Sequence, residues 1–146
     1  MENAQNMVLI EPVGRIMAKI GKLYQANLRA ELSHLDIDRS FYPLLLIESR
    51  NGMTQQELAR ELSCDKVQVV RIIDYLSKHG YVQRVQNPTD KRKYELTITE
   101  KARLLIPEIR KVIDKTSSIA FKGLSEMQID ELYGNLNILE INLLSK

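Results

Sequence analysis

Two helix-start signals stand close together in the middle of the chain, and they restrict the fold more than any other feature. In the first, Thr54 is followed three residues later by Glu57, so the two side chains can pair with each other's backbone N–H groups. Asp65 and Gln68 repeat this spacing. The pattern predicts two short helices, over about 55–62 and 66–79, joined by a turn of a few residues. That arrangement is a helix-turn-helix.

Two alternating segments follow the second helix. The stretches "YVQRVQ" and "YELTIT" flank "NPTDKRK", which opens with turn-forming residues. Alternation on both sides of such a turn predicts a β-hairpin, with Val82, Leu96 and Ile98 facing inward. A hairpin directly after a helix-turn-helix is a wing. The fold class we expect is therefore mainly α with a small β-hairpin, a winged helix-turn-helix.

Further helices are expected on both sides of this unit. Apolar residues at helical spacing predict helices over about 11–32 and 40–49, and over about 100–121 after the hairpin. Pro107 lies inside the third of these, so we expect a kink or break near Leu104. A last helix begins at Ser125, which can form a capping box with Gln128. It carries a heptad seam made of Ile129, Leu132, Leu136, Leu139 and Leu143.

Charge is distributed unevenly, although the net charge is only +2. Residues 60–93 hold eight basic and four acidic residues, whereas residues 124–146 hold one basic and four acidic residues. A basic middle suggests a face that meets a polyanion, and ordinary solvated charge explains it equally well. The chain has one cysteine and no apolar stretch or signal pattern typical of membrane or secreted proteins. We therefore expect a cytoplasmic protein.

The second helix of a winged helix-turn-helix enters the major groove of DNA. Here Gln68 can bond adenine through two hydrogen bonds, Lys66 or Arg71 can reach guanine or a phosphate, and Val67 can contact a thymine methyl group. Each of these residues alone is equally compatible with a solvated helix face. We also expect DNA contacts from Thr54 and Gln55 at the start of the preceding helix.

The wing tip holds three cations and one acid. Arg92 is expected to enter the minor groove, while Lys91 and Lys93 meet phosphates. Asp90 can bond the backbone of the tip or hold Arg92 in an extended pose before DNA arrives. The lone acid is therefore predicted to be a positioning residue.

The segments "LARELSCDKVQVVRIIDYLSKHGYVQR" and "DKRKYELTITEKA" resemble the multiple-antibiotic-resistance regulator (MarR) family. The family carries an Asp-x-Arg signature in its wing. The resemblance implies one domain over 1–146, with a DNA-binding part over about 40–99 and dimerisation helices over about 8–35 and 100–146. It implies a homodimer that binds a pseudo-palindromic DNA operator. The family often has small hydroxyl residues where this chain has Val67 and Val70, which puts more weight on Gln68 and Arg71.

Many members of that family are repressors released by a small aromatic or anionic effector. The resemblance places the effector pocket between the dimer helices and the winged part. By position, Tyr24, His34, Tyr42 and Arg50 are candidates to line it, and each also has an ordinary structural explanation, such as packing or helix capping. No cofactor is expected.

Other functions remain open on the residues alone. Cys64 lies at the start of the groove helix, where a helix dipole favours a thiolate, so a redox-responsive regulator is one alternative. Asp65 beside it opposes that role, and a structural cysteine is favoured. A winged module that binds proteins instead of DNA is another alternative. His34, Asp36 and Asp38 are poorly spaced for a metal, and no motif typical of an enzyme is present, so neither a metal site nor catalysis is expected.

Overall fold

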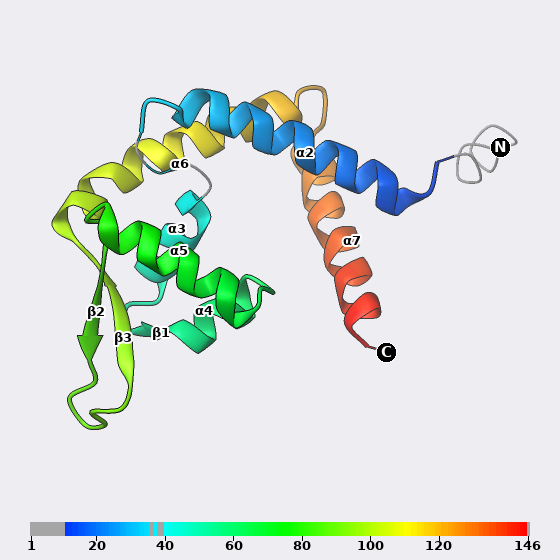
Figure 1. The fold of residues 1–146 in the computed structure, drawn as a ribbon. Helices are drawn as coiled ribbons and strands as arrows, with labels where there is room; N and C mark the ends of the chain where they lie inside the picture. The colour runs from blue at the N-terminus through cyan, green and yellow to red at the C-terminus, as the bar shows by residue number, and fades with distance from the viewer. Residues whose placement is uncertain (1–10, 36, 38–39, 146) are drawn as a thin grey trace, which may run out of the picture.

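The structure is a computed structural model that describes residues 11–35, 37 and 40–145. Two long helices, α2 (Val13–Leu32) and α6 (Glu100–Ala120), pack against each other and form the upper edge of the molecule in Figure 1. The winged part lies below one end of this pair. The last helix, α7 (Glu126–Leu144), descends from the other end and stands apart from the winged part.

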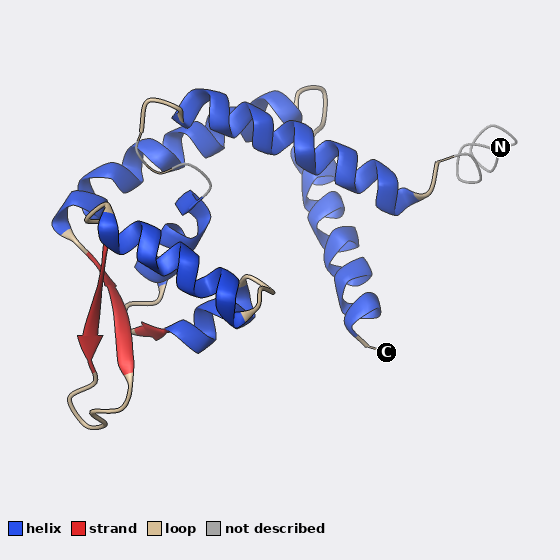
Figure 2. Cartoon of the chain, in the orientation of Figure 1, coloured by secondary structure: helices blue, strands red, loops and turns tan. Residues whose placement is uncertain are grey.

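The winged part contains the predicted elements in the predicted order. Its helices are α3 (Phe41–Ser49), α4 (Gln55–Glu61) and α5 (Lys66–Lys78), and its strands are β1 (Met53–Thr54), β2 (Val82–Gln86) and β3 (Tyr94–Ile98). Figure 2 shows the hairpin of β2 and β3 projecting from this part of the molecule. The winged helix-turn-helix fold expected from the sequence is confirmed.

All three predicted capping boxes are present. Thr54 Oγ1 accepts a hydrogen bond from the Glu57 N–H at 3.1 Å, and Glu57 Oε2 accepts one from the Thr54 N–H at 3.3 Å. Asp65 with Gln68 and Ser125 with Gln128 form the same reciprocal pair. These bonds satisfy backbone donors that the helices themselves leave unpaired, which is why the sequence located the helix starts so closely.

The sheet has a third strand that the sequence analysis missed. The two-residue strand β1 pairs antiparallel with β3, where Met53 is opposite Leu96, so the strand order is β1-β3-β2. Two residues are too few to show an alternating pattern, and only the pairing with β3 reveals the strand. Because of β1, the start of α4 is joined directly to the wing.

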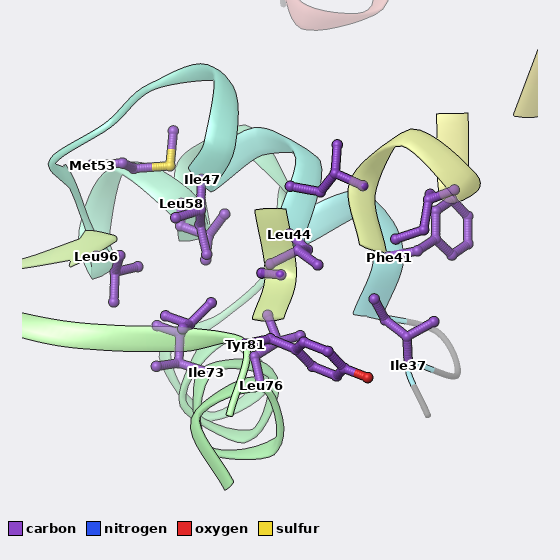
Figure 3. Close-up of a cluster of buried hydrophobic side chains, with 14 of the residues drawn as sticks. Ile37, Phe41, Leu44, Ile47, Met53, Leu58, Ile73, Leu76, Tyr81 and Leu96 are labelled. Carbon is purple, nitrogen blue, oxygen red and sulfur yellow. The ribbon is translucent and has the colours of Figure 1, made fainter. Parts of the chain in front are cut away.

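One apolar core holds the winged part together. Leu44 and Ile47 from α3, Leu58 from α4, and Ile73 and Leu76 from α5 are fully buried. Figure 3 shows these side chains converging with those of Ile37, Phe41, Met53, Tyr81 and Leu96. α5 is therefore held by a rigid scaffold on its inner face.

Of the kink or break expected near Leu104, the break is wrong. α6 runs from Glu100 to Ala120 as one helix with Pro107 inside it. Proline removes the hydrogen bond that its nitrogen would donate to the carbonyl of residue 103. Both Arg103 and Pro107 are exposed, so water can reach that carbonyl and the helix continues.

Much apolar surface is left uncovered on α2 and α7. Val13, Ile20 and Leu23 of α2 are more than half exposed, and α7 has no buried residue at all. Within the described part of the chain, each helix is too short or too polar to cross a bilayer.

Candidate nucleic-acid interface

The first turns of α5 present the predicted base-reading residues to solvent. Lys66, Val67, Gln68 and Arg71 are exposed, and the Val67 side chain is 61% exposed although it is apolar. Val69, Ile73 and Leu76 occupy the opposite face and are buried. An exposed valine beside polar side chains can contact a thymine methyl group, and the cations can bind phosphates or guanine.

The Gln68 side chain already has a hydrogen-bond partner in this structure. Its Oε1 accepts a bond from the Asp65 N–H at 3.2 Å as part of the capping box. Among the described residues, its amide nitrogen has no hydrogen-bond partner and can donate to a base. Reading adenine through two bonds would therefore require Oε1 to accept a second bond or Gln68 to leave its cap.

The wing tip holds its cations outward around an ordered turn. Lys91, Arg92 and Lys93 are exposed, whereas Asp90 is half-buried. Asp90 Oδ1 accepts a hydrogen bond from the Arg92 N–H at 3.1 Å, and its backbone oxygen accepts one from the Lys93 N–H at 3.0 Å. The carboxylate thus bonds the backbone of the tip, which is the first of the two roles expected for it.

An ion pair connects the wing with α5. Arg84 of β2 donates from Nη2 to Asp74 Oδ1 of α5 at 2.9 Å. Surface pairs contribute little to the free energy of unfolding, but this pair joins the two elements that are expected to enter neighbouring grooves. Arg84 is not among the residues predicted from the sequence, because a base in an alternating strand carries no motif of its own.

A small cavity lies between α4 and the strands. It measures about 390 Å³, and Gln55, Arg60, Arg84 and Lys93 are among its lining residues. Thr54 also lines it, with its hydroxyl engaged in the helix cap. The predicted contacts Thr54, Gln55 and Lys93 therefore face one shared notch, whose wall also includes Arg60, Arg84 and Glu57.

A larger cavity of about 1140 Å³ lies between the long helices and the winged part. Tyr24 of α2 and Tyr42 of α3 line it, as the sequence analysis expected. Its wall also includes Gln68 and Arg71, two of the residues expected to read DNA. The remaining lining residues include the apolar Leu28, Phe41, Leu45, Leu62, Ile72 and Ile113.

Two predicted pocket residues lie elsewhere. His34 is exposed and pairs with Glu108 of α6, with 2.8 Å between Nε2 and Oε1. Arg50 forms the C-terminal cap of α3 and pairs with Glu61 at 2.6 Å. Neither belongs to the lining of the large cavity. Arg110, which the sequence analysis did not select, does line it and is paired with Glu48 of α3.

Cys64 is half-buried on the wall of the large cavity, immediately before α5. Its backbone N–H donates to the Ala59 oxygen at 3.1 Å, which helps to close the turn between the two helices. Of the weak metal candidates, Asp36 and Asp38 lie outside the described residues. The described residues contain no group of three side chains suited to a metal ion.

Residues 39–94 match the model of the MarR family. The HTH-type transcriptional regulator BilQ of Clostridioides difficile (strain CD3) is 26% identical over 100 residues, which cover 68% of each chain.

Solved structures agree with these matches. A mutant MarR from E. coli complexed with operator DNA superposes with a TM-score of 0.82 and 26% identity, covering 90% of this chain and 96% of that one. An uncharacterized SlyA-like transcription regulator from Listeria monocytogenes has a TM-score of 0.82 and 27% identity, covering 88% and 87%. Residues 39–94 thus form a MarR-type domain, and the chain is similar over most of its length to winged helix-turn-helix transcriptional regulators.

Proposed function

We propose that this protein is a homodimeric repressor that binds a pseudo-palindromic DNA operator and is released by a small-molecule effector. The observation that carries the proposal is the exposed face of α5 next to a cationic wing, with the two joined by the Asp74–Arg84 pair. α5 would read bases in the major groove, and Arg92 would enter the adjacent minor groove. Similarity to a regulator solved with operator DNA supports this arrangement.

The dimer is supported by the apolar surface of α7. Leu132, Leu136 and Leu139 are each 37% exposed and Leu143 is 71% exposed, so the heptad seam lacks a complete covering within one chain. Exposed apolar residues on α2 would extend the same interface. A second copy related by a two-fold axis would cover both helices and place two recognition helices about one duplex turn apart.

The large cavity supports an effector with an aromatic body and an acidic group. Its wall combines apolar side chains with the cations Arg71 and Arg110 and one acid, Asp114. Arg110 is already paired with Glu48, whereas among the described residues Arg71 has no ion pair. An acidic ligand would therefore be drawn to Arg71. Binding there would occupy a side chain that is also expected to contact DNA.

Salt-dependent DNA binding tests the first part of the proposal. Anisotropy with a duplex selected by the protein from a randomised pool should show saturable binding that weakens as salt increases. Arg92→Ala should weaken binding to all duplexes and lower the salt slope by about 1. Lys111→Ala removes an exposed cation from α6 and should leave the slope unchanged. If no saturable binding appears, the alternative of a protein-binding winged module gains support.

Calorimetry without DNA tests the effector proposal. Naphthalene-2-carboxylate should bind the wild-type protein more tightly than the neutral naphthalene-2-carboxamide. Arg71→Gln should remove that preference, because it removes the cation but keeps a polar side chain of similar reach. Equal binding of both compounds to the wild-type protein would contradict the expected acidic class.

A further inference from the structure

The loop at the wing tip is organised around the side chain of Asn87. Its Oδ1 accepts three hydrogen bonds, from the Thr89 N–H at 2.9 Å, the Thr89 hydroxyl at 2.8 Å and the Asp90 N–H at 3.1 Å. Asparagine commonly closes turns through its own side chain in this way. Here one oxygen holds the residues that precede the three cations.

The other end of the Asn87 amide is attached to the sheet. Its Nδ2 donates to Glu95 Oε1 at 2.8 Å. Glu95 lies in β3 opposite Thr54 of β1, and a Cβ at Gly52 would lie 3.2 Å from Glu95 Oε2. Glu95 is therefore confined between two segments of the scaffold. Gly52, whose φ is +88°, leaves it the space it occupies.

The same connections continue to Arg92. Asn87 fixes Asp90 through the Asp90 N–H, and Asp90 Oδ1 accepts the Arg92 N–H at 3.1 Å. The base of the loop is closed by the Asn87 N–H, which donates to the Lys93 oxygen at 2.8 Å. An uninterrupted series of hydrogen bonds thus runs from the sheet to the backbone of Arg92.

We propose that Asn87, anchored by Glu95, is a positioning residue that presents Arg92 to the minor groove. This inference rests on the DNA-binding role proposed above. A loop that is ordered before DNA arrives loses less conformational freedom on binding, so its contacts yield more affinity. Asn87 is half-buried and touches no groove itself in this role. It acts by fixing the position of the Arg92 backbone, from which the side chain extends.

The variant Asn87→Asp tests the anchor with little change in shape. The introduced carboxylate keeps an oxygen for Thr89 and Asp90 but replaces the N–H donor with a second acceptor facing Glu95. Two carboxylates at hydrogen-bond distance repel each other. We expect about tenfold weaker binding to the selected duplex, which corresponds to the loss of one hydrogen bond plus this repulsion.

Exchange of donor and acceptor should restore the contact. Glu95→Gln alone should change affinity by less than about threefold, because its amide oxygen can still accept from Asn87. In Asn87→Asp/Glu95→Gln, the new amide donates to the introduced carboxylate, and affinity should return to within about threefold of the wild-type value. Glu95→Ala also removes the charge but leaves no acceptor, and it should weaken binding where Glu95→Gln does not.

This double-mutant cycle separates the effect of the Asn87–Glu95 hydrogen bond on DNA affinity from the effect of net charge. Removal of the Glu95 charge contributes an electrostatic gain in DNA affinity in either background, so the relevant quantity is the excess gain in the Asn87→Asp background. If Glu95→Gln improves that variant no more than it improves the wild-type protein, the anchor is overturned. Circular dichroism and thermal unfolding would establish that each variant is folded. The DNA affinities of Glu95→Ala and Glu95→Gln compare loss and retention of the acceptor at equal charge, with Asn87 intact.

A second cycle links the anchor to Arg92. Arg92→Ala should cost much less affinity in the Asn87→Asp background than in the wild-type protein, because the misplaced arginine already contributes little. Equal costs in both backgrounds would overturn the positioning role, even if the proposed DNA binding is correct. If Arg92→Ala has no effect on the wild-type protein, the proposed groove contact itself fails.

Discussion

Gln68 Oε1 accepts a hydrogen bond from the Asp65 N–H at 3.2 Å, while Asp65 Oδ1 accepts one from the Gln68 N–H at 2.8 Å. The residue best suited to recognise adenine therefore also stabilises the start of the helix that carries it. Recognition of adenine uses both the oxygen and the nitrogen of the side-chain amide. Stability and base reading therefore use the same oxygen.

The two roles of the Gln68 side chain predict different results for two substitutions. Gln68→Glu keeps an oxygen for the cap and removes the amide donor, so stability should be maintained while the preference for adenine is lost. Gln68→Ala should lose both, with a decrease in the free energy of unfolding of about 1 kcal/mol. Thermal unfolding and selection from a randomised duplex pool measure the two effects separately. An unchanged base preference in both variants would exclude Gln68 as a reading residue.

Substitution of Asp90 should separate its hydrogen bond from its charge. Asp90→Ala removes the acceptor for the Arg92 N–H and should reduce DNA affinity about threefold to tenfold, although the positive charge of the wing increases. Asp90→Asn keeps an acceptor and also removes the charge, so its affinity should equal or exceed that of the wild-type protein. Tighter binding by Asp90→Ala, measured by anisotropy, would show that Asp90 acts only through its charge.

The turn between α4 and α5 contains backbone strain at Ser63. Its φ is +50°, a left-handed conformation that side chains with a Cβ rarely adopt. That conformation costs about 1–2 kcal/mol for a residue other than glycine, and glycine avoids this cost. Glycine in turn gives the unfolded chain more conformational entropy, which offsets about 0.5–1 kcal/mol of the gain. Ser63→Gly should therefore increase the free energy of unfolding by up to about 1 kcal/mol. Urea denaturation, with Ser63→Ala as the control that keeps the strain, measures the difference.

A charge in the heptad seam of α7 should disrupt the proposed dimer. Leu136→Glu would place a carboxylate within an apolar interface, where burial of an unpaired charge is strongly unfavourable. Sedimentation velocity should then detect a monomer, and DNA binding should weaken. Gln128→Glu adds the same charge on the same helix and keeps the capping box, so it should remain dimeric. If Leu136→Glu sediments like the wild-type protein, the seam is not the interface.

The parts of the fold that were predicted correctly depend on local chemistry. Thr54, Asp65 and Ser125 each pair with a residue three positions later, so the sequence alone locates three helix starts. β1 escaped prediction because its pairing with Leu96 joins residues far apart in the chain. The break at Pro107 was predicted from a local rule, but exposure of the freed carbonyl lets α6 continue.

The site divides in the same way. Exposure of Lys66, Val67 and Arg71 follows from helical spacing, and the structure agrees. The pairing of Arg84 with Asp74 depends on how the wing folds back toward α5, which no local pattern encodes. Tyr24 reached the cavity wall but His34 did not, because sequence position does not determine which loop residue turns inward.

α7 exposes apolar residues around much of its circumference, including Tyr133, Ile138 and Ile141 outside the heptad seam. A helix with no buried residue in its own chain contributes little to the stability of an isolated molecule. The amount of functional protein would then depend on the pairing of two chains. The concentration of dimer would rise more than proportionally with the total concentration of the protein. A modest change in synthesis of the regulator would produce a larger change in operator occupancy.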